Sequence, residues 1–65
     1  MSANESLGHA QELAERLRSK LDDLERLADA GDIDGAVDDL AEIAELAKQI
    51  EAEVQRARAS ADAGA

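Results

Sequence analysis

The sequence predicts an all-α protein, an antiparallel two-helix hairpin with helices over about residues 3–30 and 34–60. Three observations predict it. Apolar residues recur at alternating spacings of three and four in both halves of the chain, which is the period of a coiled-coil stripe. Two glycines, Gly31 and Gly35, interrupt this pattern near the middle. The 65 residues include no Pro and no aromatic residue, and they are rich in Ala, Leu and Glu, as long helices are.

The first predicted helix has an apolar stripe wide enough to pack in a bundle. Heptad positions a and d are Leu7, Ala10, Ala14, Leu17, Leu21, Leu24 and Ala28, and Leu13 and Leu27 add position g. Ser2, with Glu5 three residues later, fits a capping box at the start of this helix. Asn4 and Ser6 are alternative caps.

The second predicted helix repeats this pattern. Its positions a and d are Ile33, Ala36, Leu40, Ile43, Ala47, Ile50, Val54, Ala57 and Ala61, with Val37 and Ala44 at e and Leu46 at g. Asp34 or Asp32 is the expected N-cap, because a carboxylate accepts hydrogen bonds from the first free N–H groups. We expect the helix to end near Ser60 and a frayed tail over 61–65.

The segment between the helices reads Gly31-Asp32-Ile33-Asp34-Gly35. Its first glycine lies where a residue in the left-handed conformation would end the first helix. Its length suits a tight turn between antiparallel helices. The sequence therefore predicts one domain over 1–65, in which the two a/d stripes face each other.

A single hairpin is expected to leave part of these stripes uncovered, because two helices touch along only one line. A second copy would cover them in a four-helix bundle with two-fold symmetry. The mixture of Ala with Leu and Ile suits interdigitated layers. We therefore expect a homodimer or higher homo-oligomer, with a larger protein as the alternative partner. The predicted interface residues are Leu7, Leu13, Leu17, Leu21, Leu24, Leu27, Val37, Leu40, Ile43, Leu46, Ile50 and Val54.

The net charge of −9, from 16 acidic and 7 basic residues, argues against contact with nucleic acid or anionic lipid. No apolar run approaches the length of a membrane span, and no leader pattern is present. The sequence therefore predicts an acidic cytoplasmic protein with no nucleic-acid partner and no membrane partner.

His9 is the one residue that raises the question of a metal site, because Glu5 and Glu12 lie one turn away on either side. In the heptad frame these residues occupy positions c and f, which point away from the a/d stripe. The second helix is expected to have no inward-facing Glu or His. We therefore expect His9 to be exposed to solvent and no metal to bind there.

Residues 30–41 resemble a calcium-binding loop in the spacing of three Asp residues and Gly35. Ala30 and Ala41 occupy the first and last ligand positions, so the two strongest ligands are missing. The Asp and Gly residues also suit a turn and an N-cap. We expect no calcium site.

Catalysis needs a nucleophile beside a base, and the chain offers neither in a suitable place. It has no Cys and one His, and its serines are expected at positions outside the buried stripe: Ser2, Ser6, Ser19 and Ser60. The sequence predicts a non-enzymatic oligomerisation or interaction protein without a cofactor. The alternative is a non-catalytic accessory subunit of a larger enzyme.

From the turn onward, one set of residues follows the order of a known family. They are Gly31-Asp32-Ile33, Ala36-Val37, Leu40, Leu46-Ala47-Lys48, Ile50, Val54 and Ala57. On these residues, about half of the chain resembles the small subunit of exodeoxyribonuclease VII, a short acidic hairpin. The chain departs from that family at Ile43, where the family often has Gly, and in a turn that is one residue shorter. The resemblance implies a non-catalytic nuclease subunit whose active site lies on another chain.

The mixed Ala and Leu layers are also similar in architecture to the repressor-of-primer family, whose acidic hairpins dimerise into a four-helix bundle. That family contacts RNA through a face that includes an aromatic residue. This chain has no aromatic residue, so RNA binding is not implied.

Overall fold

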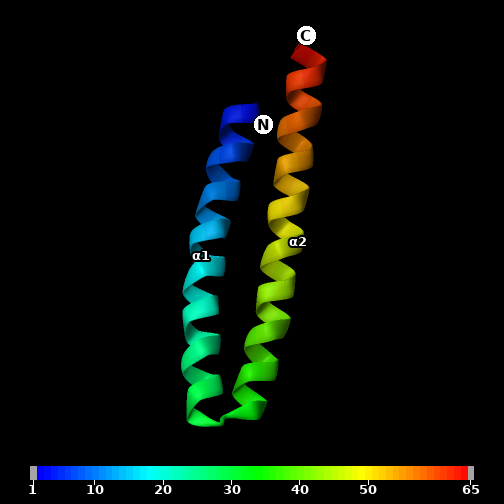
Figure 1. Cartoon of the computed structure of the whole chain (residues 1–65). Coiled ribbons are helices and arrows are strands. Elements are labelled where there is room, and N and C mark those ends of the chain that lie inside the picture. Colours follow the sequence, from blue (N-terminus) through cyan, green and yellow to red (C-terminus); the bar gives the residue numbers. More distant parts are fainter. Residues whose placement is uncertain (1, 65) are drawn as a thin grey trace.

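The protein is an antiparallel pair of long helices, as the computed structural model describes it over residues 2–64 (Figure 1). Helix α1 spans Ala3–Ala30 and helix α2 spans Ile33–Gly64. The two chain ends lie at one end of the rod and the turn lies at the other. The rod measures 51 × 14 × 12 Å. The predicted all-helical hairpin is confirmed, and no strand occurs in residues 2–64.

Helix α1 begins with the predicted cap. The Oγ of Ser2 accepts a hydrogen bond from the backbone N–H of Glu5 at 3.2 Å. The carbonyl of Ser2 accepts the first helical bond from Ser6 N–H at 3.0 Å. A side chain that accepts such a bond stabilises a helix by about 1 kcal/mol relative to Ala. Of the three candidate caps, Ser2 is the one used.

The turn ends α1 at Gly31, whose φ of 74° lies in the left-handed region. This conformation lets Gly31 N–H donate to the carbonyl of Ala28 and Asp32 N–H donate to that of Leu27. Two carbonyls of the last turn are thereby satisfied, as in a Schellman motif. The predicted role of Gly31 as the terminating residue is confirmed.

Asp32 caps the second helix. Its Oδ1 accepts a hydrogen bond from Gly35 N–H at 3.0 Å, which decides between the two aspartates proposed as caps. A Cβ on Gly35 would lie 2.6 Å from the other carboxylate oxygen of Asp32. Glycine at this position therefore lets the carboxylate approach the backbone of α2.

Helix α2 is longer than predicted at its C-terminal end. The expected end was Ser60 with a frayed tail over 61–65, whereas helical geometry continues to Gly64. Two of the four added residues, Ala61 and Ala63, are alanine, the residue with the highest helix propensity. The rest of the predicted tail, Ala65, lies outside the described residues.

The line of contact between the helices follows positions d and g, where the sequence predicted a and d. On these columns the buried or half-buried residues are, in α1, Ala3, Ser6, Ala10, Leu13, Leu17, Lys20, Leu24 and Leu27, and in α2 Ala36, Asp39, Ile43, Leu46, Ile50, Glu53, Ala57 and Ser60. Outside them Asp23, Gly35 and Ala52 are also half-buried. The physical reason is the width of the stripe. A helix covers only about two adjacent columns of its neighbour, and columns a, d and g together are wider than that. The hairpin covers d and g and leaves column a outside.

Neither helix, over the residues that the structure places, has a segment long and apolar enough to cross a membrane.

Candidate functional site

The side chains left outside the hairpin contact form the candidate site. The exposed large apolar residues are Leu7, Leu21, Ile33, Val37, Leu40 and Val54, with exposed fractions from 38% to 74%. All occupy position a except Val37, which is at e. We call the a columns of both helices, together with Val37 and Ala44, the apolar face.

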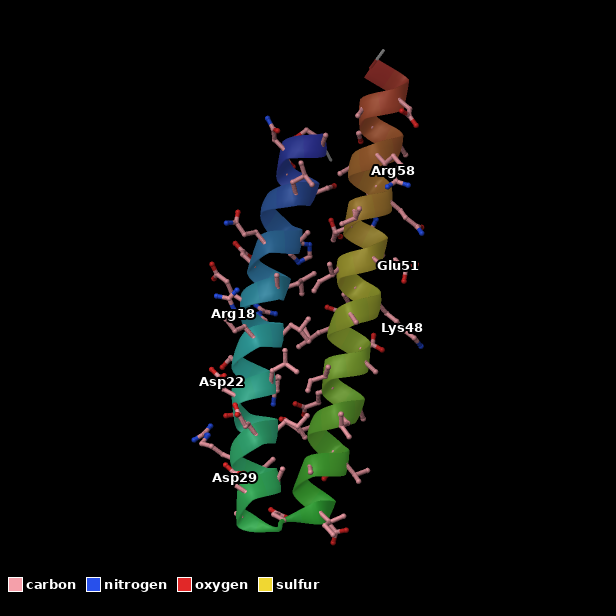
Figure 2. The ribbon with its side chains drawn as sticks, in the orientation of Figure 1. Arg18, Asp22, Asp29, Lys48, Glu51 and Arg58 are labelled. Carbon is pink, nitrogen blue, oxygen red and sulfur yellow. The ribbon has the colours of Figure 1, made fainter. Side chains whose placement is uncertain are left out.

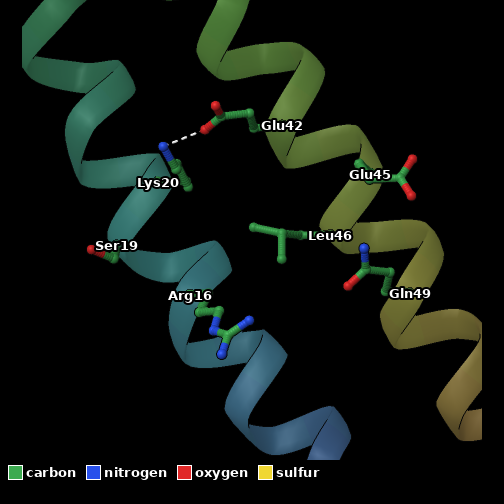
Figure 3. A pocket seen from close by; sticks show the side chains of 7 residues that line it. All are labelled: Arg16, Ser19, Lys20, Glu42, Glu45, Leu46 and Gln49. Carbon is green, nitrogen blue, oxygen red and sulfur yellow. Dashed lines mark ion pairs between the residues drawn. The ribbon is translucent and has the colours of Figure 1, made fainter.

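Both a columns lie on the same side of the hairpin. In an antiparallel pair that meets along d and g, the two a columns flank the contact on one side and the two c columns on the other. The c residues Arg16 and Glu42 confirm this geometry, because they line one open groove that also includes Lys20 (Figure 3). The hairpin therefore has one charged side and, opposite it, the apolar face.

Charged residues also occupy the outward edges of the rod. Figure 2 labels six such side chains that point away from the other helix: Arg18, Asp22, Asp29, Lys48, Glu51 and Arg58. Charge therefore surrounds the apolar face without entering column a, so the face is a continuous strip along the rod.

The column between the apolar face and the hairpin contact is only partly covered. Leu17 and Leu24 of α1 are half-buried, and so are Ile43 and Ile50 of α2. These d residues touch the other helix on one flank and are open toward the apolar face on the other. Further protein on the apolar face would complete their burial.

The hairpin buries little apolar surface by itself. Among the described residues, the buried apolar ones are Ala10, Leu13 and Ala57. The accessible surface is 4738 Å². A compact monomer of 6.9 kDa exposes about 4,000 Å², so the excess is about 700 Å².

The contact between the two helices contains charged groups as well as apolar ones. The Nζ atom of Lys20 lies 3.4 Å from Oδ1 of Asp39, a residue that is 7% exposed. Lys20 also forms an ion pair with Glu42 (Figure 3). The hydrogen bond to Glu42 raises the pKa of Lys20 above its usual value, with a further contribution from Asp39. The second carboxylate oxygen of Asp39 is buried and accepts no hydrogen bond within the described residues. Lys20 therefore belongs to the hairpin contact, which the sequence predicted to be apolar.

A second polar contact lies near the open end of the rod. Glu53 is 3% exposed, and one of its carboxylate oxygens lies 3.3 Å from Nδ1 of His9 and also pairs with Arg56. The other oxygen is buried without a hydrogen-bond partner in residues 2–64. His9 is exposed to solvent as predicted, with a side chain that is 46% exposed, and it also pairs with Glu53 across the hairpin. The expectation that α2 has no inward-facing Glu is wrong.

Ser6 corrects a third expectation. It was predicted to lie outside the buried surface, but it is fully buried beside α2, and its Oγ has no partner within the described part of the chain. No base lies within hydrogen-bond distance of that Oγ, so the position does not make Ser6 a nucleophile. Over residues 2–64, no group of three His, Cys, Asp or Glu is placed to hold a metal ion.

A signal for these missed residues was present in the sequence. Column g repeats every seven residues as Ser6, Leu13, Lys20 and Leu27 in α1 and as Asp39, Leu46, Glu53 and Ser60 in α2. Only the apolar members of this column, Leu13, Leu27 and Leu46, belong to the predicted stripes. Residues seven positions apart lie on the same side of a helix, so the polar members of column g lie in the contact together with its apolar members.

The structure divides the predicted interface residues into three groups. Leu7, Leu21, Val37, Leu40 and Val54 lie on the apolar face. Leu17, Leu24, Ile43 and Ile50 are half-buried next to it, and Leu13, Leu27 and Leu46 lie inside the hairpin contact. Only the first two groups are placed to meet another molecule.

The fold and this surface define a class of protein, an antiparallel helical hairpin with one uncovered apolar face. No protein-family model, no curated protein and no solved structure matches the chain. The resemblance of the second half to the small subunit of exodeoxyribonuclease VII stays a prediction.

Proposed function

We propose that the protein is a non-enzymatic oligomerisation module, in which two copies of the hairpin associate through their apolar faces into a four-helix bundle. The observation that carries this proposal is the apolar face itself. Six large apolar side chains on one side of a rod are between 38% and 74% exposed. Isolated exposed apolar residues are ordinary in proteins, but a continuous strip of them is typical of an interaction surface.

The excess surface of the rod is comparable in size to one side of a standard protein interface. A standard protein interface buries about 800 Å² on each partner. The surface that the hairpin exposes beyond that of a compact monomer is about 700 Å². Burial of apolar surface contributes about 25 cal/mol per Å², so covering the face is a large term for a chain with so few buried apolar residues.

The polar residues inside the hairpin contact support the same conclusion. Asp39 and Glu53 are desolvated there, each with one oxygen that accepts no hydrogen bond from the described residues. Burying such groups opposes folding. The hairpin contact alone is therefore a weak source of stability, and association through the apolar face would supply the missing part.

A second copy is the occupant that the face itself favours, because both helices contribute the same heptad columns to it. In a four-helix bundle the a and d columns point toward the bundle axis, and g faces one neighbouring helix. The hairpin already has g in contact, d half-covered and a open. A larger protein that covers the same face, as in an accessory subunit, is the competing outcome.

Sedimentation equilibrium over a range of concentrations tests the proposal. We expect the wild-type mass to be twice that of the chain, and Leu21→Asp to shift the equilibrium strongly toward the monomer, because it places a charge in the buried face. Ser19→Asp on the charged side is the control and should keep the wild-type mass. A wild-type chain that is fully helical and monomeric at every concentration would overturn the proposal.

Affinity capture then separates the two occupants. If a stoichiometric larger protein binds the wild type but not Leu21→Asp, and purified wild type does not dimerise, the accessory-subunit alternative is favoured. The face would then have the same residues but a different partner.

A further inference from the structure

The apolar face is built of layers whose sizes alternate along the rod. The contacts Lys20–Glu42 and His9–Glu53 fix the register of the two helices. In this register the a residues pair at the same level as Leu7 with Val54, Ala14 with Ala47, Leu21 with Leu40, and Ala28 with Ile33. The face therefore has a bulky layer, a small layer, a second bulky layer and a mixed layer, in that order from the chain ends to the turn.

We infer that the two copies stack with their turns at opposite ends of the bundle. This inference rests on the proposed self-association and specifies its geometry. In two symmetric arrangements of the copies, each helix is antiparallel to both of its neighbours. In one arrangement the two turns lie at the same end of the bundle, and in the other they lie at opposite ends. The layers decide between them, because close packing requires large side chains on one face to meet small ones on the other.

With the turns together, every layer would meet its own copy. Leu21 and Leu40 would face the same two residues of the second hairpin, and the small layer of Ala14 and Ala47 would face alanines. Four large side chains would crowd at one level, and a gap would remain at the next. Overpacking and unfilled gaps each reduce stability.

With the turns apart, the order of the layers is reversed in the second copy. The two-fold axis then passes between the layer of Ala14 and Ala47 and the layer of Leu21 and Leu40, so that each small layer meets a bulky one. The outer layers also pair, with Leu7 and Val54 opposite the mixed layer. The bulky side chains of each copy fill the spaces above the alanines of the other.

This axis also lies close to the middle of α1. Residues 14–21 are at the centre of α1, which spans Ala3–Ala30. Two copies related by this axis overlap along most of α1 and along α2 from the turn to about Val54, so that the large apolar residues of the face are covered. Stackings displaced by a heptad would pair bulky layers with bulky layers and leave the ends uncovered.

Two e residues lie next to the axis and report on the arrangement. Ala44 of one copy comes close to Ala44 of the other, where a small side chain permits close approach of the two α2 helices. Arg18 meets its own copy at the solvent-exposed rim, with Glu15 and Asp22 of the same helix nearby to offset the charge. With the turns together, Ala44 would instead lie beside Arg18 of the second copy.

Disulfide cross-linking tests the inference, and the chain suits it because it has no native Cys. Ala44→Cys alone should form a covalent dimer in high yield under mild oxidation if the turns are apart. A mixture of Ala44→Cys and Arg18→Cys chains should give no excess of the mixed dimer. Each variant is first checked by sedimentation for the wild-type mass, so that a loss of association is not mistaken for a change of geometry.

A spin label on Asp34→Cys provides an independent distance. With the turns apart, the two labels should lie about 30 Å apart, because Asp34 is nine to ten residues along α2 from the axis and each residue adds about 1.5 Å. With the turns together the labels would be neighbours. A dimer with neighbouring labels and a preferred 18–44 cross-link overturns the inference but leaves self-association intact. A monomeric wild type overturns self-association and the inference together.

Discussion

The inner contact between the helices and the outer apolar face are built from the same heptads but differ in chemistry. The inner contact contains Ser6, Lys20, Asp39 and Glu53 among its apolar residues. The outer face contains only aliphatic residues in column a. A chain that folded as an isolated hairpin would gain more by reversing this distribution, because burying polar groups costs free energy and burying aliphatic ones contributes it. A polar inner contact beside an aliphatic outer face is expected of a chain in which association buries the outer face too.

The largest expected effect compares one leucine from each region. Leu13, 1% exposed, is the large apolar residue that the hairpin buries completely, so Leu13→Ala should lower the free energy of unfolding by about 2–5 kcal/mol. In the proposed bundle Leu21 would be buried as well, so Leu21→Ala should then approach the same loss although the hairpin leaves this residue 48% exposed. Circular dichroism during urea unfolding, at several protein concentrations, measures both.

The concentration dependence makes this comparison decisive. Leu21→Ala should lower stability more at low concentration than at high concentration, because association is linked to folding by mass action. A loss under about 0.5 kcal/mol for Leu21→Ala, independent of concentration, is what an exposed surface position gives. That result would mean that only the inner contact is a core.

The same comparison shows what the sequence could predict. Periodicity determined both helices, and Ser2 and Gly31 marked the limits of α1 correctly, because capping and left-handed termination are local effects. Which two of the three apolar columns face the other helix is not local. It depends on how two long stripes divide between one neighbour and any further partner.

The polar interior was missed for a related reason. Asp39 and Glu53 have ordinary surface chemistry, and no local feature shows that they are buried. Only their seven-residue spacing from Leu46 places them in the contact column. The apolar face, in contrast, was predicted as uncovered apolar surface because the total width of the stripe exceeded what one neighbour could cover.

The turn holds the inner contact in register, and Gly31 tests its contribution. Gly31→Ala forces a side chain into the left-handed region at φ 74° and should cost about 1–2 kcal/mol. Gly8 is the matched control, since it lies in the interior of α1, where an added Cβ would have no neighbour within 4 Å beyond the backbone of its own helix. Gly8→Ala should raise stability by about 0.5–1 kcal/mol. Thermal unfolding followed by circular dichroism should therefore give a lower midpoint for Gly31→Ala and a higher midpoint for Gly8→Ala than for the wild type.

The buried carboxylate of Glu53 tests whether polarity in the inner contact has a cost. Its two partners, His9 and Arg56, are 46% and 62% exposed, so both would regain water if the carboxylate were removed. We expect Glu53→Leu to raise the free energy of unfolding by about 1 kcal/mol, because the desolvation of the carboxylate is relieved and no buried charge is left behind. Glu45→Leu, at an exposed position of the same helix, is the control and should not stabilise. Destabilisation by Glu53→Leu would show that its ion pairs outweigh its desolvation.

The smallest expected effect concerns the other polar contact, Lys20 with Glu42 and Asp39. The hydrogen bond to Glu42 is the main cause that raises the pKa of Lys20 in the folded chain above the ordinary value of 10.5. A raised pKa means that the charged form is favoured by folding, so this contribution is complete below pH 10.5 and is lost as pH rises through the folded value. The loss should be modest, since the contact is open to solvent on the charged side of the rod.

Urea unfolding at a series of pH values measures this loss. Between about pH 9 and about pH 12, the free energy of unfolding should fall more in the wild type than in Lys20→Met. Lys48→Met, which removes a lysine from the outward edge of α2 (Figure 2), should retain the wild-type pH dependence. Equal pH dependence in Lys20→Met and the wild type would mean that this contact contributes nothing to stability, and that apolar burial alone holds the two helices together.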